Sequence, residues 1–116
     1  MRHRKKTKIL DRKKEAREMM LRNMVSSVLI FEKVKTTKTK AKAVQPLVEK
    51  SITIAKKGDL QARRKLISTL PQKMAVKKAM EVLGERYKDK QSGFTRVTNL
   101  KARQGDGAQM AQIELI

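Results

Sequence analysis

Residues 94–115, FTRVTNLKARQGDGAQMAQIEL, determine the fold class, because the helical spacing of apolar residues ends before this segment. The segment begins with a run rich in threonine and valine, and apolar and polar residues alternate near its end, as is typical of strands. Between the two runs, Asp106-Gly107 favours a tight turn, because this pair tolerates positive φ values. We therefore predict an antiparallel hairpin with strands over 94–102 and 109–115.

The chain before the hairpin carries mainly helical periodicity, with apolar residues three or four positions apart. Pro46 should kink the second helix, because proline removes an internal hydrogen bond. Alternation around 33–36 predicts one short strand, which should join the hairpin in one sheet. The four helices are predicted over about 11–31, between Thr36-Thr37 and Gly58, over 60–70 after the capping Asp59, and over about 73–87.

These elements predict a single α+β domain in the order α-β-α-α-α-β-β, with helices packed on one face of a small mixed sheet. Residues 1–10 should form an extended basic arm and residues 11–116 the domain. A chain of 116 residues with 39% hydrophobic content can bury one modest core. Val48 and Leu83 are expected inside it. The methionines at helical spacing, Met20, Met24 and Met80, are interpreted as core residues rather than ligands.

Charge is the strongest functional signal. Thirty Lys and Arg against eleven Asp and Glu give a net charge of +19, so nucleic acid is the expected partner. Binding to a membrane surface would require exposed apolar side chains, but the core needs the apolar residues of this chain. No apolar run approaches the ~20 residues of a membrane span. We predict a soluble, intracellular protein with no membrane partner.

The excess of positive charge is weighted toward the N-terminus. Residues 1–8, MRHRKKTK, contain five lysines or arginines and no acid, and such a segment has no use for its charge within the chain. Only three aromatic residues are present, too few for a base-stacking platform, so contacts should run from cations to phosphates. The candidate contacts in the arm are Arg2, His3, Arg4, Lys5, Lys6 and Lys8.

Catalytic, metal-binding and cofactor chemistry find no support in the sequence. His3 is the only histidine and lies in the arm without a fixed partner, and the acids are scattered. Residues 105–107 favour a turn rather than a phosphate loop, because no helix follows them. Two alternatives remain open: a DNA-packaging or regulatory module, although no helix-turn-helix or zinc spacing is found, and a small basic nuclease.

Seven motifs occur in order along the chain: MRHRKK, Leu21-Arg22-Asn23-Met24, residues 32–37 with 40–42, residues 58–64, Arg86-Tyr87, residues 93–97, and a C-terminal set over 103–115. Together they resemble the bacterial family of large-subunit ribosomal protein seventeen along essentially the whole chain. Departures from its pattern are Ala16 and Gln61 where histidine is common, Gln109 for proline and Ser92 for glycine.

The resemblance implies a structural, non-enzymatic component of the large ribosomal subunit in the cytoplasm, near the nascent-chain exit. Its expected partners are large-subunit rRNA and neighbouring ribosomal proteins, with no small-molecule substrate and no homo-oligomer. The arm would thread among rRNA helices, folding as it binds. The domain would offer a second RNA surface, for which we single out Arg17, Arg22, Asn23, Thr37, Lys40, Lys42, Arg63, Arg64, Arg86 and Arg96.

Overall fold

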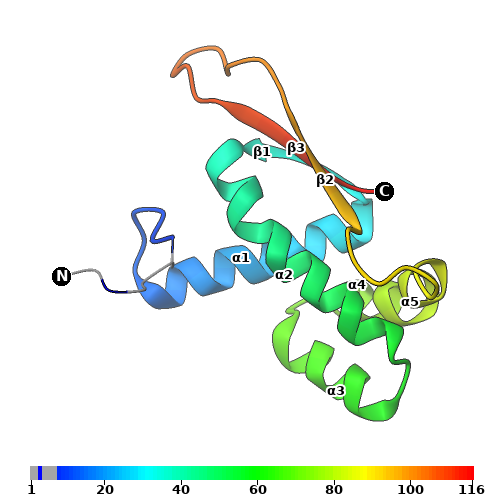
Figure 1. Cartoon of the computed structure of the whole chain (residues 1–116). Helices are drawn as coiled ribbons and strands as arrows, with labels where there is room; N and C mark the ends of the chain where they lie inside the picture. The colour runs from blue at the N-terminus through cyan, green and yellow to red at the C-terminus, as the bar shows by residue number, and fades with distance from the viewer. Residues whose placement is uncertain (1–2, 4–7) are drawn as a thin grey trace.

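A computed structural model describes residue 3 and residues 8–116 of the chain (Figure 1). Helices and a small sheet follow one another in the predicted order, which confirms the α+β class. The elements are α1 (Lys14–Phe31), β1 (Lys33–Thr37), α2 (Lys38–Lys56), α3 (Leu60–Thr69), α4 (Lys73–Lys78), the π-helical η1 (Ala79–Leu83), α5 (Gly84–Arg86), β2 (Thr95–Asn99) and β3 (Met110–Leu115).

The sheet has the strand order β1-β3-β2, so the predicted hairpin and the predicted early strand do share one sheet. Both pairings are antiparallel, with Val34, Ile113 and Val97 in register across the three strands. The expectation of a mixed sheet is therefore wrong, because β3 runs back between two strands that both oppose it. One face of the sheet packs on α2, which contacts all three strands.

The hairpin is confirmed, but its first strand is shorter than predicted. β2 ends at Asn99, and the chain beyond it is held by single backbone bonds, from Leu100 N to Met110 O at 2.9 Å and from Arg103 N to Ala108 O at 2.8 Å. Gly107 has a φ of +67°, as the turn prediction required. In Figure 1 the connecting loop extends away from the helices.

The helix-capping predictions hold at two helix starts. The Thr37 hydroxyl accepts a hydrogen bond from Lys40 N, and the Asp59 carboxylate accepts one from Ala62 N at 2.8 Å. α2 continues through Pro46 without interruption. α3 ends one residue before the predicted limit, since Leu70 precedes Pro71 and is extended, the conformation that proline favours in its neighbour.

Two helix predictions need correction. α1 begins at Lys14 rather than near residue 11, because Leu10 and Asp11 have positive φ values and form a turn. The helix predicted over 73–87 is interrupted by the π-helical η1. Next to η1, Gly84 lies so close to α2 that an added Cβ would be 2.8 Å from the Ala55 carbonyl oxygen. The spacing of the apolar residues did not reveal this widened turn.

The core surrounds α2, which packs against the sheet and against α1, α3, η1 and α5. Val48 and Leu83 are fully buried there, as predicted. Met24 and Met80 pack against the core from its edge. In α1, the buried side chains all belong to the C-terminal half, where Val28 and Leu29 are inaccessible. The N-terminal half is therefore left to line the surface.

Candidate nucleic-acid interface

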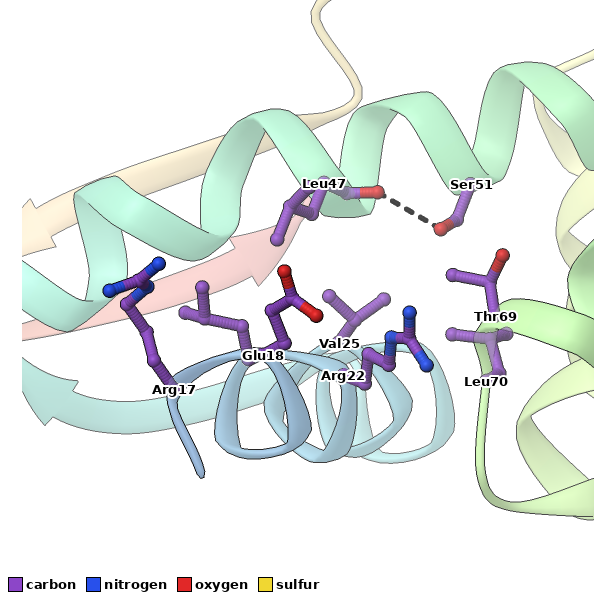
Figure 2. Close-up of a pocket in the computed structure, with 9 residues that line it drawn as sticks. Arg17, Glu18, Arg22, Val25, Leu47, Ser51, Thr69 and Leu70 are labelled. Carbon is purple, nitrogen blue, oxygen red and sulfur yellow. Dashed lines mark hydrogen bonds between the residues drawn. The ribbon is translucent and has the colours of Figure 1, made fainter. Parts of the chain in front are cut away.

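The N-terminal half of α1 and the middle of α2 enclose a hollow of about 330 Å³ (Figure 2). Arg17 and Arg22 stand at its two ends, and Glu18 points into it between them. Glu18 and Arg22 are one helical turn apart and share a face, as do Arg17 and Leu21. Arg17 and Arg22 are five positions apart, which separates them by ~7.5 Å along the axis of α1 and by roughly 140° around it. Two of the predicted RNA contacts thus flank a single concavity.

A second hollow, of about 360 Å³, adjoins the first. It is lined by Lys8, Arg17 and Lys42 together with apolar residues of α2. The two hollows share Arg17, Leu21 and Leu47, so we treat them as one feature, the α1–α2 groove. The fold therefore brings together four predicted contacts, Lys8, Arg17, Arg22 and Lys42, from the arm end and from two helices.

The cations of the α1–α2 groove are not neutralised within the described part of the chain. None of the ion pairs found there involves Lys8, Arg17, Arg22 or Lys42. Glu18 and Arg22, at the helical spacing that supports pairing, form no salt bridge among these residues. With four cations and a single acid, the rim of the groove attracts polyanions.

Other predicted contacts have local structural roles or lie beside the groove. Lys40 is half-buried near Lys42 on the first turns of α2. Thr37 is the N-cap of α2, and its side-chain oxygen accepts a hydrogen bond from Lys40 N. Asn23 is exposed on α1, and its backbone carbonyl accepts a hydrogen bond from the Ser27 hydroxyl.

Arg63 and Arg64 are exposed on α3 but do not line the α1–α2 groove. Arg63 instead lines a separate hollow of about 340 Å³ between α3 and α4, together with Ile67 and Lys73. Lys73 was not singled out from the sequence, and nothing in its neighbourhood along the chain marked it. The α3 cations form a second positive region.

Arg86 has a partner inside the protein. It forms an ion pair with Glu32, which also binds Lys78 at 2.8 Å. Hydrogen bonds from Arg86 and then Lys78 lower the pKa of Glu32 to about 2, and the same contact raises the pKa of Arg86. Arg86 also lies over the ring of Tyr87, 5.9 Å from its centroid. The Arg86 guanidinium is therefore already engaged by Glu32 and Tyr87 within the protein.

Arg96 lies on the face of the sheet opposite α2. Its Nε donates to the Glu114 carboxylate at 3.2 Å, and Lys33 approaches the same carboxylate at 3.9 Å. Lys35, two residues along β1, shares this face by strand alternation. Lys33 and Lys35 were not singled out from the sequence, although the alternation that predicted the strand already placed them on one side.

The loop between β2 and β3 carries two further cations that the sequence reasoning did not select. Lys101 and Arg103 are both exposed. Arg103 binds Asp106 at 2.5 Å, and this contact lowers the pKa of Asp106 to about 2. The net charge of the loop is therefore only weakly positive.

Residues 1–2 and 4–7 of the arm lie outside the described residues. Arg2, Arg4, Lys5 and Lys6 are not among them, while His3 is described and exposed. Within the described part of the chain, no group of histidine, cysteine or acidic side chains could hold a metal ion. No helix among the described residues is long and apolar enough to cross a membrane.

Comparison with known proteins gives a consistent result. A family model described as ribosomal protein L17 matches residues 20–116. A protein of Paracoccus denitrificans named large ribosomal subunit protein bL17 is 46% identical over 116 residues, covering all of this chain and 83% of the relative. A protein of the same name from Hydrogenobaculum sp. is 41% identical over 117 residues, covering all of this chain and 99% of the relative.

Proposed function

Since the chain belongs to the ribosomal protein L17 family, we propose that it binds and stabilises large-subunit rRNA by neutralising phosphates. Family membership makes it a structural constituent of the large ribosomal subunit. The observation that supports RNA binding most strongly is the α1–α2 groove, whose four cations have no acid partner among the described residues. Unpaired cations on a rigid scaffold suit a dense array of phosphates.

The proposed mechanism is the replacement of mobile counterions by fixed side chains. Converging rRNA segments repel one another, and a protein that supplies lysine and arginine releases the counterions that each segment had condensed. Helices α1 and α2 hold Arg17, Arg22 and Lys42 at fixed separations. The net charge of +19 adds a long-range attraction that brings RNA to this surface.

The basic arm of residues 1–10 extends the same surface in this proposal. Lys8, at its end, lines the α1–α2 groove beside Arg17, so the groove marks the place where arm and domain meet. An arm that leaves from this point can follow an RNA strand bound at the groove. Arg63, Arg64 and Arg96 would contact other segments, because they lie on separate surfaces.

The proposed place of action is the cytoplasmic ribosome, near the nascent-chain exit and beside other large-subunit proteins. This placement depends on the family resemblance. The same resemblance gives the chain a single copy among RNA and protein neighbours, without a catalytic role.

Sucrose-gradient sedimentation of an extract containing the tagged chain tests the proposal. The tagged chain should migrate with the large subunit, and the purified chain should prefer structured large-subunit rRNA to duplex DNA at matched salt. A tagged chain that remains entirely at the top of the gradient, or equal affinity for both nucleic acids, would contradict the proposal.

A further inference from the structure

The α1–α2 groove has a feature that phosphate neutralisation does not use. Its floor is apolar, formed by Leu21 and Val25 of α1, Leu47 of α2 and Leu70 at the end of α3. Leu47 is 38% exposed there, so its contacts within the chain are incomplete. A phosphate gains nothing from such a surface, whereas the flat faces of an unstacked base are apolar and bind to it.

The polar groups of the groove are few and separated. Figure 2 shows the Glu18 carboxylate pointing into the cavity, with Arg22 on the side of Thr69 and Arg17 at the opposite end. The Ser51 hydroxyl donates to the Leu47 carbonyl at 2.9 Å, so its proton is already used. The groove thus offers a ligand one strong acceptor at its centre and two cations at its ends.

We propose that the α1–α2 groove receives a single unstacked nucleobase of the rRNA, held on the apolar floor with its flanking phosphates on Arg17 and Arg22. This inference rests on the proposed function and adds base recognition to it. A pocket of about 330 Å³ is in the size range of small-molecule sites. Arg17 and Arg22 are ~7.5 Å apart along the axis of α1, so the two cations can contact different phosphates.

The Glu18 carboxylate indicates which base the groove prefers. A carboxylate only accepts hydrogen bonds, so it selects a base edge that presents N–H donors. Guanine presents two adjacent donors on its Watson–Crick edge and can satisfy both carboxylate oxygens. Uracil presents one donor between two acceptors that the carboxylate repels.

Charge complementarity favours RNA over a protein segment as the occupant. An apolar peptide could cover the floor, but it would leave Lys8, Arg17, Arg22 and Lys42 without counter-charges. A nucleotide provides an apolar face and two phosphates in one unit. The combination of an apolar floor with a cationic rim is therefore better matched by a base within a strand.

The test measures the affinity of the full chain for large-subunit rRNA over a range of salt concentrations. Leu47→Ala should weaken binding on the order of tenfold, because it removes base contact, and should leave the slope of log affinity against log salt unchanged. Leu60→Ala is the matched control, since Leu60 is 61% exposed and lies outside the groove. It should bind like the wild type.

Two further experiments identify the ligand. A photoreactive residue, p-benzoylphenylalanine, placed at position 47 should crosslink to one rRNA nucleotide, a guanosine, in assembled subunits. Glu18→Gln should weaken binding of the unmodified rRNA less than it weakens discrimination between guanosine and uridine at the crosslinked position.

The outcomes separate this inference from the proposed function. A wild-type chain that binds no rRNA would overturn the proposed function and the inference with it. A wild-type chain that binds, with Leu47→Ala indistinguishable from Leu60→Ala, would overturn the inference alone. A crosslink from position 47 to a protein, or to no fixed nucleotide, would also overturn it.

Discussion

The two halves of α1 use the same apolar stripe for different purposes. In the C-terminal half, Val28 and Leu29 are fully buried in the core. In the N-terminal half, Leu21 is half-buried and lines an open groove beside Arg17 and Arg22. A stripe that is continuous in the sequence thus leaves the core partway along the helix. Beyond that point its apolar residues are available to an external partner.

The ends of α1 differ in the same way. Glu32, directly after the helix, is clamped by Lys78 and Arg86, and Lys78 Nζ also donates to the Ile30 carbonyl at 2.7 Å. At the other end the N-cap is Lys13, whose own side chain makes no capping hydrogen bond. The C-terminal half is therefore fixed by packing and by charge, while the N-terminal half depends mainly on its own backbone bonds.

The largest effect is expected from truncating one leucine of the core and one leucine of the groove floor. Leu29→Ala should lower the free energy of unfolding by ~2–5 kcal/mol, because it opens a cavity in the core. Leu47→Ala, on the groove floor opposite α1, should cost less than ~1 kcal/mol, because its side chain is partly solvated already. Urea denaturation followed by circular dichroism measures both. Equal losses would show that the groove floor is as tightly packed as the core.

Hydrogen exchange of backbone amides compares the two halves directly. Amides at positions 26–30 should exchange at least tenfold more slowly than those at positions 18–22, because the latter open without exposing buried residues. Two-dimensional NMR of the free chain in deuterated buffer gives the rates. Uniform protection along α1 would mean that the helix opens as one unit and that its two halves do not differ in local stability.

A smaller effect is expected at the charged clamp. The pKa of Glu32 is about 2 when folded, below its usual 4.5, so its stabilisation is present above pH ~4.5 and is lost as the pH falls toward 2. Glu32→Gln should lower stability at pH 7 by about 1 kcal/mol, after allowance for solvent screening of a partly exposed group. The variant should also show a flatter decline between pH 5 and 2. Parallel pH profiles for variant and wild type would show that the ion pairs of Glu32 do not stabilise the fold.

Local sequence patterns were sufficient to predict the elements that depend on neighbouring residues. Alternation around Ile113 identified β3, the Asp106-Gly107 pair identified the turn, and helical spacing placed Val48 and Leu83 in the core. Each of these features is encoded within a few residues. The resemblance in ordered motifs identified the family, which the comparisons confirm.

The features that the sequence did not predict depend on contacts between distant segments. Glu32 and Arg86 are 54 residues apart, so no local pattern shows that Arg86 is paired. The apolar residues around the π-helical turn at 79–83 have a spacing that an ordinary α-helix would also produce, so the sequence pattern does not distinguish the two. The α1–α2 groove requires knowing where α1 leaves the core, and the stripe continues on both sides of that point.

We propose that rRNA phosphates bind to the cations of the α1–α2 groove, which have no acidic partner among the described residues. The most direct test is the salt dependence of rRNA affinity for the double variant Arg17→Gln/Arg22→Gln. Its matched control is Lys57→Gln/Lys88→Gln, which removes the same charge from exposed sites outside the groove. Both variants should stay within ~0.5 kcal/mol of wild-type stability.

The groove variant should lower the slope of log affinity against log salt by about 1.4–1.8, at roughly 0.7–0.9 for each of two lost phosphate contacts. The control variant should change the slope much less, because its lysines contribute only to the general field. If both double variants give the same slope as the wild type, or the same change as each other, the groove is not the phosphate-binding surface.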